Sequence, residues 1–104
     1  MIEVEFTYDI LSNIDEEAYS RLARKATIMM LNAEGFIELR ANRNLLGSPH
    51  RKRSSLWKSM EHYARLAENP DFQKLNYEFR KYVTHTKVVI WGPSPFVPES
   101  IRPE

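Results

Sequence analysis

The first ten residues alternate apolar and polar side chains. Apolar residues occupy the even positions from Ile2 to Ile10, and acidic residues or Thr7 stand between them. Alternation with a period of two is typical of a β-strand that buries one face. The pattern predicts a strand over residues 2–10 whose apolar face is turned toward a core.

Residues 12–35 change to a helical pattern. Acidic residues stand near the start of this segment, and Gly35 follows its last apolar position. Ser12 or Asn13 is expected to cap the helix, and Gly35 to end it in a left-handed conformation. The apolar stripe at helical spacing consists of Ala18, Leu22, Ala26, Met29, Met30 and Ala33.

Two strands and a broken helix follow. The segments FIELRANRNLL (36–46) and HRKRSSLW (50–57) have strand patterns, and the turn residues at 47–49 make a hairpin the simplest connection. Ser59 is expected to cap the next helix. That helix is predicted to break at Asn69-Pro70, because proline lacks the N–H that a continuing helix needs.

The last strand is predicted in TKVVIWG (86–92), a nearly continuous apolar run with β-branched residues that suggests burial on both faces. Residues 93–104 hold most of the prolines and are expected to be extended and non-helical. We therefore divide the chain into one domain over 1–92 and a Pro-rich C-terminal tail over 93–104. The apolar tail residues Phe96, Val97 and Ile101 are expected to dock on a helix face or on another subunit.

The element order β-α-β-β-α-β predicts an α+β, ferredoxin-like fold, with a four-stranded antiparallel sheet and both helices on one face. The other face of the sheet would then carry Glu3 and Glu5. Arg51 and Arg53, or their neighbours, are expected beside them on the adjacent strand. The apolar last strand favours a homodimer in which these two uncovered sheet faces meet.

Composition excludes several classes of function. The chain of 104 residues has 15 basic and 14 acidic side chains, so no strong global charge favours nucleic acid or an anionic membrane. There is no cysteine, which excludes disulfides and thiolate metal sites. No apolar run approaches the roughly 18 residues of a membrane span, and the N-terminal segment lacks the pattern of a signal peptide. A cytoplasmic protein is expected.

Metal and cofactor motifs are also missing. His50, His62 and His85 are not at the short spacings of a metal site, so no metal is expected. The basic run at 50–53 has no accompanying stacking aromatics and is interpreted as a solvated hairpin or a set of interface ion pairs. With 3 glycines the chain has no Gly-rich phosphate loop, and no nucleotide cofactor is expected.

Three short motifs carry a family resemblance: SLWKSMEHY around Trp57, AENPDF at the helix break, and AEGFIEL at the second strand. Together with the topology they resemble the antibiotic biosynthesis monooxygenase family over residues 1 to about 92. The resemblance implies a dimeric α+β barrel. It also implies relatives that include cofactor-free oxygenases of polycyclic phenols, quinol oxygenases, haem-degrading enzymes and an isomerase.

Two branches of the family can be compared position by position. The haem-degrading branch has an Asn, a Trp and a His where this chain has Thr7, Leu66 and Asn76, so without an iron ligand haem degradation is not expected. The aromatic-polyketide branch has a Trp and a Tyr that match Trp57 and Tyr63. Its nearby Asn and Arg are replaced here by Arg53 and Tyr77.

The resemblance implies cofactor-free oxygenation of an aromatic or quinol-type small molecule in an apolar pocket between sheet and helices. Tyr63 would then be a hydrogen-bonding catalytic group, His62 a proton acceptor and Arg40 an anion stabiliser. The candidate substrate-binding residues are Trp57, Tyr8 and Tyr77. His62 and Tyr63 are adjacent on a helix and point about 100° apart, so they are not both expected to face one pocket.

Each of these residues also has a structural interpretation. A Trp at a junction of strand and helix usually packs in the core, and Tyr8 has the pattern of an ordinary core residue. Two further interpretations of the whole protein stay open at this point. One is a non-catalytic small-molecule-binding or structural homodimer, and the other is an isomerase or lyase that uses the same pocket.

Overall fold

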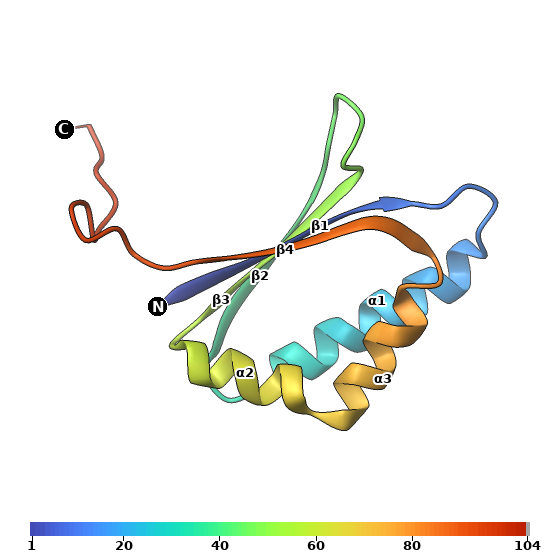
Figure 1. Ribbon diagram of the computed structural model, residues 1–104, viewed down its shortest axis with the longest axis horizontal. Coiled ribbons are helices and arrows are strands. Elements are labelled where there is room, and N and C mark those ends of the chain that lie inside the picture. The colour runs from blue at the N-terminus through green and yellow to red at the C-terminus, as the bar shows by residue number, and fades with distance from the viewer. Residues whose placement is uncertain (104) are drawn as a thin grey trace.

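A computed structural model describes residues 1–103 of the chain, and Figure 1 shows a sheet with all helices on one face. The elements in chain order are β1 (Ile2–Ile10), α1 (Glu16–Leu31), β2 (Phe36–Arg43), β3 (Arg51–Trp57), α2 (Met60–Glu68), α3 (Pro70–Phe79) and β4 (Val83–Trp91). The strands are ordered β2-β3-β1-β4, and every neighbouring pair is antiparallel. The predicted α+β, ferredoxin-like fold is confirmed.

The pairing of β1 with β3 decides which side chains face the helices. Phe6 lies opposite Arg53, and Glu5 lies opposite Ser54. Residues directly opposite each other in an antiparallel pair point to the same side of the sheet. Arg51 and Arg53 therefore lie on the helix-covered face, and it is the neighbours of these arginines that lie beside the glutamates. We call the other side, which no helix covers, the open face.

Helix α1 begins later than the sequence suggested. Its N-cap is Asp15, whose carboxylate accepts a hydrogen bond from the Ala18 N–H at 3.0 Å. The predicted caps Ser12 and Asn13 lie in the preceding turn, where Asn13 has a φ of 60°. A left-handed residue lacks the extended backbone of an N-cap, so this part of the prediction was wrong.

The later helix signals are confirmed. Ser59 caps α2 by accepting a hydrogen bond from the His62 N–H at 3.3 Å. Asn69 ends α2 and caps α3, and its side-chain oxygen accepts from the Asp71 N–H at 2.8 Å. The break falls at Pro70, as predicted, and it lets α3 turn its apolar stripe of Phe72, Leu75 and Phe79 toward the core.

Trp57 is at the centre of the larger of two core clusters and is 0% exposed. Its indole N–H donates to the Ser55 hydroxyl at 2.9 Å. The rings of Phe36 and Tyr63 pack against it edge to face, with centroids 5.5 Å and 5.7 Å away. Trp57 thus joins the ends of β2 and β3 to α2 as an internal wedge.

Strand β4 is an edge strand and begins at Val83, three positions before the predicted run. Val88 and Ile90 lie opposite Phe6 and Val4 on the helix-covered face, yet they are 47% and 40% exposed. The expectation that this strand is buried on both faces is therefore wrong within one chain. The apolar edge that results flanks the cavity described below.

The tail from residue 93 to residue 103 leaves the sheet and has no helix, as expected (Figure 1). Phe96 is 92% exposed and Ile101 is 82% exposed. Docking of the tail on a helix of its own chain is thus not observed, and docking on another subunit stays a prediction. Among residues 1–103, no helix has the length and apolar character needed to cross a membrane.

Candidate functional site

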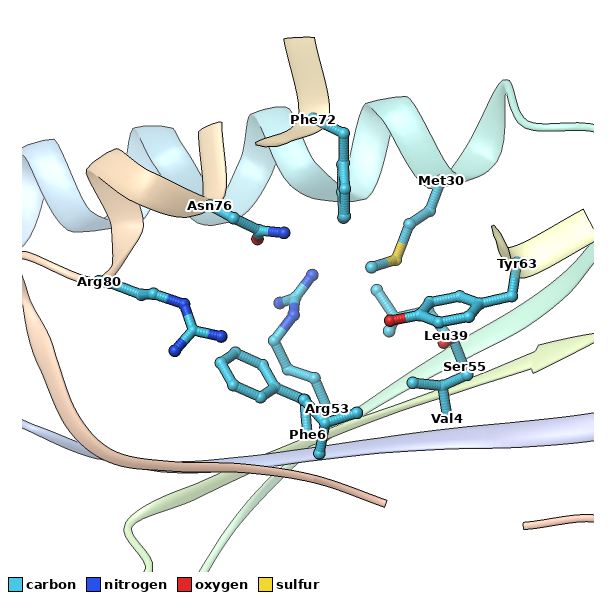
Figure 2. A pocket seen from close by; sticks show the side chains of 11 residues that line it. Val4, Phe6, Met30, Leu39, Arg53, Ser55, Tyr63, Phe72, Asn76 and Arg80 are labelled. Atoms are coloured by element: carbon cyan, nitrogen blue, oxygen red, sulfur yellow. The ribbon is translucent and has the colours of Figure 1, made fainter. Parts of the chain in front are cut away.

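A cavity of about 120 Å³ lies between the helix-covered face of the sheet and the helices (Figure 2). All four strands and all three helices contribute to its wall. Most of the wall is apolar: Val4, Phe6, Met30, Leu39, Phe72 and Val88. An apolar recess with a few polar groups is the usual character of a small-molecule site.

The polar part of the wall is formed by Arg53, Ser55, Tyr63, Asn76 and Arg80. Figure 2 shows the guanidinium groups of Arg53 and Arg80 and the amide of Asn76 turned toward one space, with the Tyr63 hydroxyl facing them. Arg53 and Ser55 share one side of β3 with Trp57, because alternate strand residues point the same way. Phe72, Asn76 and Arg80 are four residues apart, which places them in one row along α3 and its C-cap.

Arg53 is tethered to α1 across the cavity. Its Nη2 donates to the Thr27 hydroxyl at 2.7 Å, and that hydroxyl in turn donates to the Ala23 carbonyl at 3.0 Å. Arg80 is tethered in a similar way to β4, since its Nη1 donates to the Thr86 hydroxyl at 2.9 Å. Both guanidinium groups are therefore positioned by neutral hydroxyls.

The charged side chains that line the cavity are all positive. No acidic side chain lines it, and no ion pair within residues 1–103 includes Arg53 or Arg80. The arginine ion pairs in this part of the chain are formed by Arg21, Arg40 and Arg65, which do not line the cavity. The two cavity arginines thus give the recess a net positive potential that a bound anion would neutralise.

Tyr63 presents its hydroxyl to the cavity from α2, while its ring edge packs against Trp57. Burial raises the pKa of Tyr63 above its ordinary value. The phenol is therefore protonated near neutral pH, which makes it a hydrogen-bond donor to a bound ligand and not a base.

Of the six candidate residues from the sequence, Tyr63 is the one that lines this cavity. Trp57 lies behind Tyr63 and supports it without reaching the cavity. Tyr8 is in the second core cluster, where its hydroxyl is 2.8 Å from that of Tyr19, and burial raises its pKa. Trp57 and Tyr8 are thus both packed in the core and outside this cavity, and their roles in binding stay predictions.

The other three candidates do not line this cavity. The ring of His62 hydrogen-bonds to Ser59 at 2.7 Å and packs against Gly35, where an added Cβ would collide with it. Arg40 is on the open face and forms an ion pair with Glu38 at 2.9 Å. Tyr77 is 69% exposed at the surface of α3. Neither the proposed proton acceptor nor the proposed anion stabiliser is therefore in the cavity.

Sequence reasoning missed Arg80 and treated Asn76 only as a departure from a family pattern. It treated Arg53 as such a departure and also as a possible neighbour of Glu3 and Glu5 on the open face, whereas Arg53 lies opposite Phe6 on the helix-covered face. Part of the signal for them was present in the chain, once Trp57 and Phe72 are known to point inward. Arg53 has the same parity as Trp57 on its strand, and Asn76 and Arg80 continue the four-residue spacing from Phe72. Polar residues in line with core residues at such spacing indicate a polar wall inside a pocket.

A second polar cluster is at the far end of β1. The Asp9 carboxylate accepts hydrogen bonds from the Ser48 hydroxyl at 2.7 Å and the His50 N–H at 2.8 Å, and it lies 3.1 Å from the His85 ring. The Ser48 hydroxyl, together with these groups, lowers the pKa of Asp9. Nothing in the described part of the chain brings three metal-ligating side chains together. The hydrogen bonds of Asp9 to Ser48, His50 and His85 instead connect β1 to the hairpin and to β4.

The chain is similar to known proteins in structure and not in sequence. The sequence matches no protein-family model and no curated protein. A mutant of SnoaB, a cofactor-independent oxygenase from Streptomyces nogalater, is similar in structure with a TM-score of 0.78 and 11% identity, over 94% of this chain and 97% of that one. A Deinococcus radiodurans protein provisionally named an antibiotic biosynthesis monooxygenase has a TM-score of 0.79 and 13% identity, over 100% and 99% of the two chains.

A third structure, named an antibiotic biosynthesis monooxygenase, has a TM-score of 0.77 and 12% identity over 91% of this chain and 100% of that one. Fold and cavity together define a ferredoxin-like α+β protein with a ligand-sized recess between sheet and helices. That fold is the one found in antibiotic biosynthesis monooxygenase structures. The resemblance drawn from the Trp57 motif is thereby confirmed at the level of the fold.

Proposed function

We propose that the protein is a cofactor-independent monooxygenase that oxidises an aromatic or quinol-type small molecule in the cavity beneath α1 and α3. The observation that supports this most is the convergence of Arg53, Asn76, Arg80 and the Tyr63 hydroxyl on one apolar recess. Oxygenation without a cofactor requires an electron-rich substrate anion that can transfer an electron to O₂. The protein's task is then to bind the substrate, favour its anion and exclude water.

The cavity provides groups that can bind the substrate and favour its anion. The two guanidinium groups lower the pKa of a bound phenol, because an opposite charge within a few ångströms favours the ionised form. The Tyr63 hydroxyl donates a hydrogen bond to the phenolate oxygen. Among residues 1–103 no carboxylate or imidazole lines the cavity, so we infer that the phenol proton passes to solvent.

The overall reaction balances without an added reductant. A ring carbon that carries two hydrogens is oxidised to a carbonyl, one atom of O₂ becomes the carbonyl oxygen, and the other leaves as water. The four electrons come from the substrate carbon. A hydroquinone would also supply four electrons: one ring C–H becomes C–OH with an oxygen atom from O₂, the two phenol groups become quinone carbonyls, and the second oxygen atom leaves as water.

Oxygen uptake by the metal-free protein tests this function, with hydroquinones, dihydroxynaphthalenes and anthrones as substrates. We expect uptake above the uncatalysed rate that falls at least tenfold, by about 1.4 kcal/mol or more of barrier, in Tyr63→Phe and Arg53→Gln. Tyr77→Phe is the matched control, because Tyr77 is exposed and outside the cavity. Failure of every substrate to increase uptake would refute the oxygenase.

We also propose a homodimer in which the open faces of two sheets meet. This face carries acidic residues on β1, Lys52 on β3 and Trp91 on β4, a mixture of charge and apolar surface that a second copy could cover. The cavity is on the opposite side of the sheet, so such a dimer leaves it accessible. Sedimentation as a monomer at micromolar concentration would contradict this arrangement.

The alternative is a non-catalytic small-molecule-binding or structural homodimer. The observation that favours it is the lack of a general base among the residues that line the cavity. The same observation disfavours an isomerase or a lyase, since both reactions need a proton acceptor close to carbon. Ligand binding without oxygen uptake would support this alternative.

A further inference from the structure

The two cavity arginines lack a counter-charge. Arg53 is half-buried on the sheet and Arg80 is exposed at the C-cap of α3, and within residues 1–103 each is hydrogen-bonded to a threonine hydroxyl and to no carboxylate. A partly desolvated guanidinium is stabilised by an anion, and its planar donors match the two oxygens of a carboxylate. The guanidinium groups of Arg53 and Arg80 face one recess that has no acidic residue in its wall. Together they form an anion site.

The rest of the wall specifies what carries the anion. Phe6, Phe72 and Met30 surround the space next to the guanidinium groups (Figure 2). Aromatic and thioether side chains of this kind pack well against a flat ring. The ligand therefore has an apolar ring at one end and a negative charge at the other.

The size of the cavity limits the ring system. An apolar cavity of about 150 Å³ accepts benzene, and this cavity has a volume of about 120 Å³. The volume is thus slightly smaller than that of a one-ring cavity, so a single six-membered ring is the largest ring system that the space approaches, and three fused rings would extend well outside it. A single-ring ligand is thus a better match than the polycyclic phenols of the resembling family.

We propose that the cavity binds a monocyclic aromatic carboxylate, with its carboxylate held between Arg53 and Arg80 and its ring between Phe6 and Phe72. Arg53 and Arg80 together are called the arginine clamp below. The inference rests on the proposed function for the assignment of this cavity as the substrate site. It adds that the oxidisable substrate is an acid, such as a dihydroxybenzoate.

Asn76 and Tyr63 complete the recognition. The Asn76 amide lies next to the Arg53 guanidinium, and the Tyr63 hydroxyl faces both from the other side of the recess. With the carboxylate in the arginine clamp, the ring extends toward Tyr63, whose hydroxyl then meets a phenolic oxygen. The clamp thereby orients the ring so that its oxidisable end is next to the donor.

Titration calorimetry with the full-length protein tests the clamp directly. The probes are benzoate and benzamide, which have the same shape and differ in charge, followed by 2,5-dihydroxybenzoate and hydroquinone. We expect benzoate to bind at least tenfold more tightly than benzamide, because a hydrogen bond to a charged group is worth more than a neutral one. The preference should shrink as salt is added.

The variants assign the preference to named residues. Arg53→Gln and Arg80→Gln should each weaken benzoate about tenfold or more and leave benzamide unchanged, and Arg53→Lys should recover part of the loss. Arg21→Gln is the matched control, because this arginine is exposed on α1 and already paired with Glu17. Thermal melts of each variant separate a loss of affinity from a loss of folding, and an unfolded Arg53→Gln would leave Arg80→Gln to decide.

The outcomes distinguish the clamp from the oxygenase. Benzoate selectivity that depends on both arginines, without oxygen uptake on 2,5-dihydroxybenzoate or on any other substrate of the panel, supports the clamp and refutes the oxygenase. Uptake on hydroquinone with equal binding of benzoate and benzamide supports the oxygenase and overturns the clamp. Phenyl phosphate that binds more tightly than benzoate would overturn the assignment of a carboxylate.

Discussion

Replacement of Trp57 by phenylalanine tests whether this residue is a structural wedge. The side chain is 0% exposed, donates its indole N–H to the Ser55 hydroxyl at 2.9 Å, and contacts the rings of Phe36 and Tyr63. Phenylalanine keeps an aromatic ring in place but removes the outer part of the indole and the N–H. The change therefore leaves a small cavity and an unpaired serine hydroxyl.

The cost follows from these two losses. Complete truncation of a buried Trp costs about 3–5 kcal/mol, so loss of part of the indole is expected to cost about 1–2 kcal/mol. Loss of the donor to buried Ser55 adds about 1 kcal/mol. A total of about 2–3 kcal/mol corresponds to a fall in Tm of roughly 8–24 °C for a domain of this size.

Urea unfolding followed by circular dichroism measures the change, with thermal melts in parallel. Tyr77→Phe is a suitable control, because it also alters an aromatic side chain but at an exposed position, and it should stay within about 0.5 kcal/mol of the wild type. A Trp57→Phe protein as stable as wild type but unable to bind benzoate would refute the wedge and make Trp57 a pocket wall.

Two further predictions concern the ends of the sheet. Gly35 has a φ of 83°, and an added Cβ would collide with the His62 ring, so Gly35→Ala should cost about 1–3 kcal/mol in urea unfolding. Gly47→Ala is its control, because Gly47 has a φ of 132° but open space around it; equal losses in the two variants would argue against the collision. Asp9 has a pKa lowered chiefly by the Ser48 hydroxyl, so its contribution to stability is present above its unfolded pKa of about 3.9 and is lost as the pH falls through its lower folded pKa. The free energy of unfolding should thus fall less steeply below about pH 4 in Asp9→Asn than in wild type, and parallel slopes in the two proteins would contradict this.

The fold was predictable because its signals are local. The alternation in residues 2–10 and the break at Pro70 each depend on residues next to one another in the chain, and both are confirmed. The N-cap of α1 was missed because Ser12, Asn13 and Asp15 are all good caps. The turn geometry, which gives Asn13 a left-handed backbone, decides among them.

Which residues of β3 point toward the helices could not be predicted from local signals alone. Leu56 and Trp57 are adjacent and both apolar, so alternation does not reveal which of them points inward. The pairing with β1 settles it, because Trp57 lies opposite Ile2. That register turns Arg53 into the cavity, and a shift by one residue would have turned it out toward the open face.

The polar wall of the cavity therefore arises from two periodic rows that meet only in the folded chain. Positions 53, 55 and 57 alternate along β3, and positions 72, 76 and 80 follow one another along α3. Each row begins or ends with a core aromatic residue, which anchors it, and includes an arginine, which extends beyond the core. Arg53, which was the departure from the family pattern in the sequence, thus stands in one of these rows and lines the cavity. The chemistry of the cavity is therefore set by side chains placed on the fold and not by the fold itself.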